Sequence, residues 1–240
     1  MAQAYTKEQM QEAVARIRSE IADAAARSGR REEDITLCAV CKTRYSDTVR
    51  LSAQLDVDIF GENHMQELVA HAQDGAYLGK DAHFIGHLQT NKVKKVVGTA
   101  RMIQSVDSLR LLEAINSEAR KQQITQDILF EINIGLEESK SGISPSALWE
   151  LAEHAAAMDG IRVRGLMAIP PAGAEDSETR RYFEQMRKLF EKLQSCDYSN
   201  HSVDTLSMGM SGSYLAAIEE GATLVRVGTA IYGAREYRNI

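Results

Sequence analysis

Hydrophobic residues recur along the chain with two different periods, one typical of helices and one typical of strands. Residues 7–28 repeat apolar side chains at the intervals that place them on one face of a helix. These apolar positions are Met10, Val14, Ile17, Ile21 and Ala25. Thr6 and Gln9 fit a capping box at the start of this helix, and Gly29 fits its end. The chain is therefore predicted to open with a helix.

After the polar stretch 30–34, short apolar runs alternate with helix-like segments. The strand-like runs are 35–41, 57–61, 83–88, 101–106, 127–134, 162–169, 203–208 and 223–233. The helix-like segments begin near Ser46, Asn63, Thr90, Ser108, Pro145, Asp176 and Ser211. Strands that alternate with helices indicate parallel pairing through right-handed crossovers.

The number of strands favours one fold. Eight parallel strands close into a barrel, so we predict an α/β protein built as a single (β/α)8 TIM barrel with an extra N-terminal helix. That helix would occupy the place of the helix that otherwise follows the last strand. The alternative is a doubly wound open sheet, but no glycine-rich fingerprint follows the first strand. With three prolines and no low-complexity linker, residues 1–240 are predicted to form one domain.

Composition and charge argue against several classes of function. The net charge of −6 argues against binding to nucleic acid, which is met by clustered Lys and Arg. The basic run Lys92, Lys94 and Lys95 is interpreted as a solvated helix face. No apolar run approaches the roughly 20 residues that cross a bilayer. Three cysteines do not suggest a disulfide framework, so we expect a cytoplasmic protein without membrane or nucleic-acid partners.

The first strand ends on a lysine, in the stretch "LCAVCKTRY". The strands' carboxyl ends form the active face of a TIM barrel, so Lys42 would lie at the mouth of the barrel. A lysine at this position could simply meet solvent. The alternative is that a ligand reacts with it, because burial disfavours the ammonium and makes the neutral amine available as a nucleophile.

Two glycine-containing segments follow the seventh and eighth strands, "SMGMSGS" (207–213) and "RVGTA" (226–230). TIM barrels often hold a phosphate between these two loops. Backbone N–H groups near Ser211 and Gly212 would face the anion from one side, and Gly228 and Thr229 would form the other wall. Two ordinary glycine turns are the structural alternative, but both segments fall at the expected strands. The sequence therefore predicts a phosphate site.

A lysine and a phosphate site on opposite sides of one mouth suit a phosphorylated aldehyde. Pyridoxal 5′-phosphate (PLP) is such a ligand, and its aldehyde would form a covalent imine with Lys42. Arg226 would face the pyridine nitrogen and, being always charged, would hold that nitrogen unprotonated. The ring would then be a poor electron sink, which disfavours transamination.

Six blocks of this sequence resemble, in the same order, those of the pyridoxal phosphate homeostasis proteins (YggS-like proteins and the proline synthetase co-transcribed homologue). They are "AVCKT", "FGENHMQE", "HFIGHLQTNK", "GLMAIPP", "LSMGMSG" and "VRVGTAIYG", which span about residues 35 to 233. The resemblance implies a barrel like the N-terminal domain of alanine racemase. It also implies a non-catalytic protein that binds PLP, keeps intracellular vitamin B6 in balance and delivers PLP to apo-enzymes. The positions that match the family's cofactor-binding residues are Lys42, Asn63, His87, Met167, Ser207, Ser211, Gly212, Arg226, Gly228 and Thr229.

The sequence also departs from the family pattern. Cys41 stands where Ser or Thr is common, Arg44 and Tyr45 replace Lys-Pro, and Ser213 replaces a frequent Asp. Serine can still cap a helix, so we expect the phosphate site to persist. Because the loop after Lys42 differs from the family pattern, the sequence does not determine the shape of the entrance to the site or any preference for a partner.

Other functions were weighed against this interpretation. A PLP-dependent amino-acid racemase with weak activity is the main alternative, but racemisation needs a second base from an extra domain that we do not expect here. A third possibility is a Schiff-base aldolase that acts on phosphosugars, which would be a colourless protein, whereas a PLP imine is yellow. The motif Cys38-x-x-Cys41 could suggest a redox pair, but it lies in a strand, where its two cysteines face opposite sides. His83 and His87 are too far apart on a strand to share a metal ion. We predict no metal and expect a monomer, with a weak dimer left open.

Overall fold

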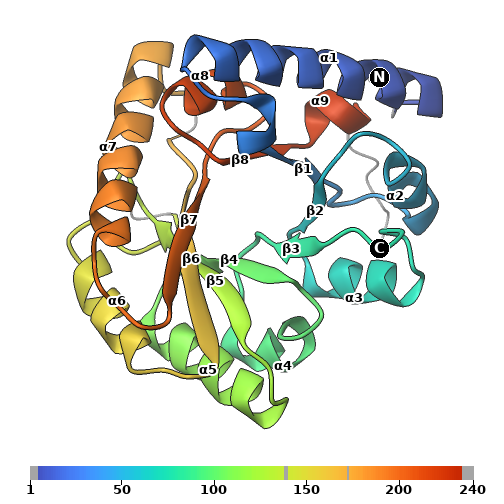
Figure 1. Cartoon of the computed structure of the whole chain (residues 1–240). Helices are drawn as coiled ribbons and strands as arrows, with labels where there is room; N and C mark the ends of the chain where they lie inside the picture. The colour runs from blue at the N-terminus through green and yellow to red at the C-terminus, as the bar shows by residue number, and fades with distance from the viewer. Residues whose placement is uncertain (1–4, 138–139, 172, 234–240) are drawn as a thin grey trace.

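The computed structural model describes residues 5–137, 140–171 and 173–233. Within these residues, eight strands pair in sequence order into a closed barrel whose ladders are parallel. The strands are β1 (Thr36–Val40), β2 (Ile59–Glu62), β3 (Ala82–Phe84), β4 (Met102–Val106), β5 (Gln126–Ile132), β6 (Ile161–Ala168), β7 (His201–Ser207) and β8 (Leu224–Val227). The predicted (β/α)8 barrel is confirmed (Figure 1).

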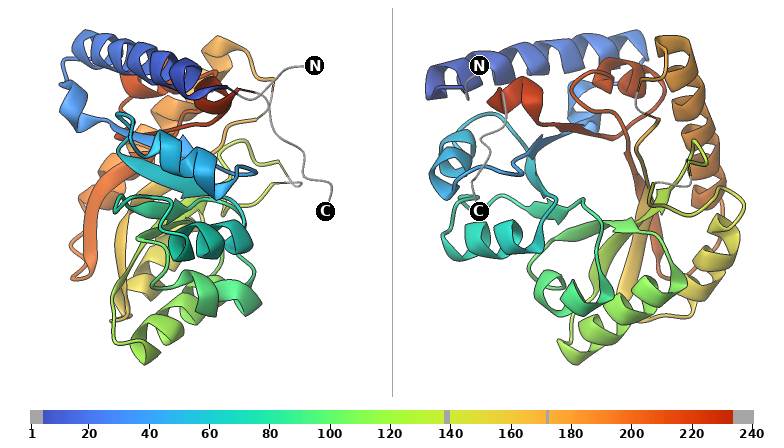
Figure 2. Two further views of the ribbon diagram at one scale, coloured as in Figure 1. Left: turned by 90° about the vertical axis from the view of Figure 1, so that its right-hand side faces the viewer. Right: turned by 180° about the vertical axis from the view of Figure 1, so that it is seen from behind.

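The helices surround the barrel. They are α1 (Lys7–Arg27), α2 (Ser46–Ser52), α3 (Met65–Gln73), α4 (Val93–Val96), α5 (Leu109–Lys121), α6 (Leu148–Ala156), α7 (Asp176–Gln194), α8 (Tyr214–Glu219) and α9 (Thr229–Tyr232), with 3-10 turns η1 (Glu32–Asp34) and η2 (Thr90–Lys92). Figure 2 shows the same ring of helices from the side and from behind. None of the described helices is both long and apolar enough to cross a membrane.

The N-terminal helix α1 closes the outer ring as predicted. Thr6 and Gln9 form the capping box, and Gly29, with a φ of 72°, ends the helix in the left-handed conformation. The apolar face of α1 is buried and packs against α2, α8 and α9. In Figure 1 it lies across the side of the ring formed by β8 and β1.

The barrel has an outer and an inner apolar region, because successive residues of a strand face opposite sides. The outer region joins the strands to the helices and forms the main core. Two small inner clusters comprise Cys38, Val40, Ile85 and Leu224 in one and Met102, Leu129 and Met167 in the other. Cys38 therefore faces inward, whereas Cys41 belongs to the outer core, and both thiols are free.

Two predicted strands are shorter than expected. The run 223–233 forms a strand only to Val227, because the chain turns at Gly228 into the short helix α9. The run 83–88 ends as a strand at Phe84. A side chain at Gly86 would place its Cβ 2.2 Å from the carbonyl oxygen of Asn63, so the loops after β2 and β3 meet at this glycine.

Candidate functional site

A cavity of about 320 Å³ lies at the carboxyl ends of the strands, where a TIM barrel carries its active site. Its walls come from the ends of β1, β2 and β8 and from the loops that follow β3, β6 and β7. The lining residues are Val40, Lys42, Arg44, Asn63, Ile85, Ile169, Met210, Ser211, Gly212, Arg226, Gly228 and Thr229.

Lys42 enters this cavity because of the strand that precedes it. Cys38 and Val40 face the inside of the barrel, and Lys42 continues the same alternation two residues after Val40. The lysine is half-buried rather than fully exposed. Its side chain therefore belongs to the barrel's interior face, which favours a role in binding over simple exposure to solvent.

The loops after β7 and β8 meet at Ser211. Its Oγ accepts hydrogen bonds from the backbone N–H groups of Gly228 and Ala230, each at 3.3 Å. Gly228 lies against β1, because a Cβ there would be 3.2 Å from the carbonyl oxygen of Val40. A Cβ at Gly212 would meet no atom within 4 Å, so its backbone is open to a ligand. The two loops form one wall of small residues and backbone amides.

Arg226 is buried at the base of the cavity, with 3% of its surface exposed. Its Nη1 donates to Ser207 Oγ at 2.5 Å and its Nη2 to the carbonyl oxygen of Ala168 at 2.9 Å. Burial lowers the pKa of Arg226 to about 10, partly offset by the charge of Glu131, so the guanidinium stays protonated near neutral pH. Two fixed acceptors set the plane of this cation.

A chain of hydrogen bonds continues from Arg226 through the inside of the barrel. Ser207 Oγ donates to Gln104 Oε1 at 2.6 Å, and Gln104 Nε2 lies 2.8 Å from His83 Nδ1. Burial lowers the pKa of His83 to about 4, so its ring is neutral and Nδ1 accepts from the amide. The chain explains why polar residues fill the centre of a buried barrel, since each has a partner.

The charged residues that line the cavity are Lys42, Arg44 and Arg226. None of the described lining residues carries a carboxylate. A cavity with three cations and two loops of backbone amides is suited to an anion. The arrangement can hold an acidic group at the β7–β8 side while the Lys42 amine meets the other end of the ligand.

The structure brings together most of the residues singled out from the sequence. Lys42, Asn63, Ser211, Gly212, Arg226, Gly228 and Thr229 line the one cavity. Three others do not line it. Ser207 lies beneath Arg226, Met167 is fully buried in an inner cluster, and the side chain of His87 is 59% exposed, 3.3 Å from Asp107.

Sequence reasoning missed the role of Arg44 in the cavity. This residue is 3% exposed, lines the cavity and donates from Nη2 to the carbonyl oxygen of Gly233 at 3.0 Å. The signal was present, since Arg44 follows Lys42 at an interval of two. The apolar walls Ile85, Ile169 and Met210 carried no comparable signal, because their residue types are common in any core.

The barrel, its strand-end cavity and the inward lysine define a class of protein. Residues 13–236 match the family model of the alanine racemase N-terminal domain, and the chain belongs to this family. The fold agrees with that of alanine racemase from Clostridium difficile 630, at a TM-score of 0.72 and 17% identity over 94% of this chain and 58% of that one.

Curated relatives identify the branch of this family. The chain is 39% identical over 226 residues to the pyridoxal phosphate homeostasis protein of Aquifex aeolicus, covering 94% of this chain and 98% of the relative. It is 40% identical over 227 residues to the protein of that name from Escherichia coli K12, covering 93% and 96%. The chain belongs to the pyridoxal phosphate homeostasis proteins.

A solved structure supports the same placement. PipY of Synechococcus elongatus, determined with PLP bound, superimposes with a TM-score of 0.77 and 30% identity. The match covers 89% of this chain and all of that one.

Proposed function

We propose that the protein binds PLP covalently through Lys42 and serves to hold and deliver this cofactor in vitamin B6 homeostasis. The observation that carries the proposal is the placing of an inward lysine and a two-loop anion site in one cavity whose described charged residues are all cations. The amine would add to the aldehyde and release water, which forms an imine. The names of the relatives and the PLP bound to PipY support the same ligand.

The remaining lining residues have roles that follow from their positions. Ser211, Gly212, Gly228 and Thr229 would bind the phosphate through hydroxyl and backbone N–H groups. Arg226 would face the pyridine nitrogen, and Asn63 would lie beside the ring. Ser207 would act through Arg226, whose Nη1 it holds at 2.5 Å. His87 and Met167, which do not line the cavity, would act only through their neighbours.

The cavity favours a carrier over a racemase. Racemisation requires a base on each face of the substrate, and a missing base removes a factor of roughly 10²–10⁴ in rate. Lys42 supplies one candidate. The described residues that line the cavity include no tyrosine, histidine or carboxylate to supply the other. The guanidinium of Arg226 also disfavours chemistry that depends on a protonated pyridine nitrogen.

The proposal is tested on Lys42. The purified protein is expected to be yellow, to be bleached by borohydride and to carry the reduced label on Lys42 in a peptide digest. Lys42→Ala should abolish the imine spectrum, because no other amine lines the cavity among the described residues. Lys94→Ala, which alters an exposed lysine of α4, is the matched control and should keep the full spectrum.

Two results would contradict the proposal. One is a Lys42→Ala protein that retains the imine spectrum, which would place the ligand elsewhere. The other is rapid conversion of L-alanine to D-alanine by the purified PLP-loaded protein, which would make it an enzyme.

A further inference from the structure

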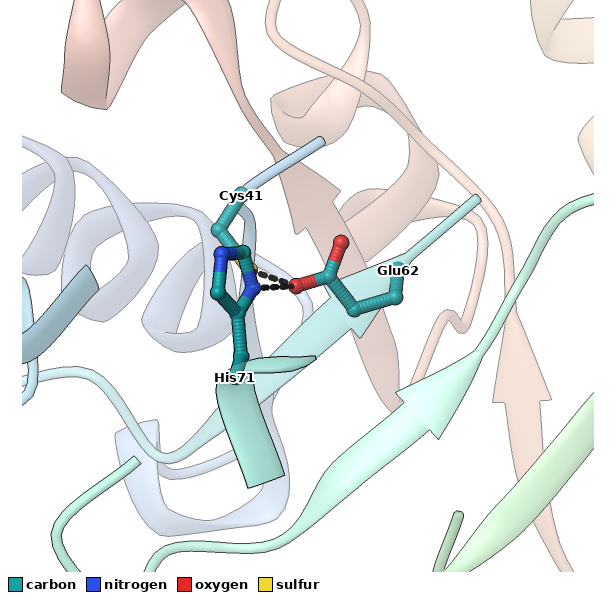
Figure 3. Close-up of side chains that lie close together, drawn as sticks. All are labelled: Cys41, Glu62 and His71. Carbon is teal, nitrogen blue, oxygen red and sulfur yellow. Dashed lines mark hydrogen bonds and ion pairs between the residues drawn. The ribbon is translucent and has the colours of Figure 1, made fainter. Parts of the chain in front are cut away.

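A cluster of buried polar side chains lies directly behind Lys42, on the outer side of the barrel. Glu62, the last residue of β2, is fully buried, and its Oε1 is the common acceptor of the cluster. Cys41 Sγ donates to it at 2.9 Å, His71 Nδ1 lies at 2.6 Å and Tyr77 OH donates at 3.1 Å. Figure 3 shows Cys41, from the end of β1, and His71, from α3, pointing at this carboxylate.

The cluster has the residue types of a metal site but not the spacing. One atom each of Cys41, Glu62 and His71 lies within 4.8 Å of the others. Ligands of a tetrahedral zinc ion lie about 3.3–3.8 Å apart, given bonds of about 2.0–2.3 Å. The contacts of 2.6 and 2.9 Å to Glu62 are instead hydrogen bonds. Burial and the charge of Glu62 raise the pKa of the Cys41 thiol well above its ordinary value, which opposes the thiolate that a metal needs.

His71 has a second partner that decides its protonation state. Its Nε2 lies 3.2 Å from the carbonyl oxygen of Arg44, which can only accept, so Nε2 carries a hydrogen. Nδ1 faces Glu62 Oε1, which already accepts from Cys41 and Tyr77, so Nδ1 is the donor of this contact as well. Both ring nitrogens then donate, and the ring is an imidazolium.

The electrostatics agree with this geometry. Burial alone would lower the pKa of His71, but the hydrogen bond and charge of Glu62 outweigh it and raise the pKa above the ordinary value. The other groups that face the ring or the carboxylate are Cys41 from the end of β1, Glu67 on α3, Tyr77 and the loop carbonyl of Arg44. Glu67 adds negative charge and so reinforces the imidazolium.

We propose that the His71–Glu62 ion pair is a positioning device that fixes the segment Cys41–Arg44 and so aims Lys42 into the cavity. The pair holds both ends of this segment, the Cys41 thiol through Glu62 and the Arg44 carbonyl through His71. Between them, Glu67 accepts from the backbone N–H of Thr43 at 3.1 and 3.2 Å. The inference rests on the proposed function and adds residues to it that do not touch the ligand.

The conformation of Thr43 explains why the segment needs such anchors. Thr43 has a φ of 64°, which is unfavourable for a β-branched residue. A backbone in this conformation persists only where its surroundings hold it. Here the anchors come from β2 and α3, and they hold the segment on both sides of Lys42.

The test separates imine formation from binding of the ring and phosphate. His71→Gln is measured with PLP and with pyridoxine 5′-phosphate, whose alcohol cannot form an imine. We expect affinity for PLP to fall about tenfold, as for a lost charge-assisted hydrogen bond, with pyridoxine 5′-phosphate binding unchanged within about twofold. His154→Gln, an exposed histidine on α6, is the control and should leave both affinities unchanged.

The wild-type protein provides a second measurement that does not depend on the variant folding. Nitrogen NMR of the His71 ring should show both nitrogens protonated at pH 7, and Glu62→Gln should lower the pKa of His71. A neutral ring at pH 7, equal loss of both ligands in His71→Gln, or no loss of either would overturn the positioning role. Failure of the proposed function looks different, because wild-type protein would then bind PLP no more tightly than Lys42→Ala.

Discussion

Glu131 is a carboxylate enclosed in the barrel opposite β1, with 8% of its surface exposed. Burial, and then the charge of Asp107, raise the pKa of Glu131 to about 7. The folded protein therefore keeps this proton up to near neutral pH, whereas the unfolded chain loses it near pH 4.5. Between these values the native state binds more protons, so stability from this group falls as pH rises.

Glu131→Gln should accordingly stabilise the protein in a pH-dependent way. The free energy of unfolding is expected to rise by up to about 3 kcal/mol at pH 8, because a buried charge is removed, with the gain vanishing near pH 4.5. His83, whose pKa is lowered, gives a slope of opposite sign, but it is common to both proteins and cancels in the difference. Denaturant unfolding at several pH values measures this. A gain that is the same at pH 8 and pH 5 would contradict the prediction.

Single residues were predictable where their chemistry is unusual at a strand end. Lys42 and Arg226 could be found because a charged residue follows or interrupts an apolar run. The Glu62–His71 pair could not, since its importance depends on contacts with Cys41, 21 residues before Glu62, and with Arg44, 27 residues before His71, which no local pattern encodes. His87 was placed near the ring by resemblance, yet its side chain is 59% exposed outside the cavity lining.

At the level of elements, β6 contains an irregularity that depends on one glycine. The pairing register of β6 shifts next to Gly165 against both neighbours, β5 and β7. Gly165 has a φ of 143°, and a Cβ there would lie 2.0 Å from the carbonyl oxygen of Thr205. The close approach of β6 and β7 is therefore available only to glycine.

Gly165→Ala should destabilise the protein strongly. We expect the free energy of unfolding to fall by at least about 3 kcal/mol, because the new side chain meets both an unfavourable φ and a fixed backbone atom. Gly75→Ala is the matched control, since its φ of 61° is also positive but its Cβ would meet open space. Its loss should be only roughly 1–2 kcal/mol. Equal losses, compared by thermal or denaturant unfolding, would contradict the steric argument.

The order of the elements was predictable from the sequence, but several of their ends were not. Alternating apolar and helical periods located all eight strands, because most of them are buried on both faces and so leave a strong local signal. The end of β8 was missed, since "GTAIYG" is apolar and reads as more strand, whereas the chain turns at Gly228. Only the packing of this turn against Val40 fixes where the strand stops.

At the scale of the whole molecule, α1 covers the side of the barrel next to β8. Ile17 lies at the centre of its buried face and is 0% exposed. The residues just before α1 contact α9, because the backbone N–H of Tyr5 donates to the carbonyl oxygen of Tyr232 at 3.0 Å. The N-terminal segment and α1 thus both contact α9, the short helix that follows the last strand.

Ile17→Ala should lower the free energy of unfolding by about 2–4 kcal/mol through the cavity it leaves. Gln11→Ala, on the exposed face of α1, should change it by less than about 0.5 kcal/mol. Both are measured by denaturant unfolding. If Ile17→Ala left stability unchanged, α1 would be an appendage and not part of the barrel's core.

The pairing between β7 and β8 is the shortest in the barrel. Their strand register consists of one pair, Ser207 with Leu224, whereas β5 and β6 pair along seven positions. The loops that extend these two strands are also the ones that meet at Ser211. An anion bound by both loops would link β7 to β8 at the point where the barrel has its shortest strand pairing. A bound ligand of this kind would stabilise the closed barrel, and the ligand-free protein would open locally first between β7 and β8.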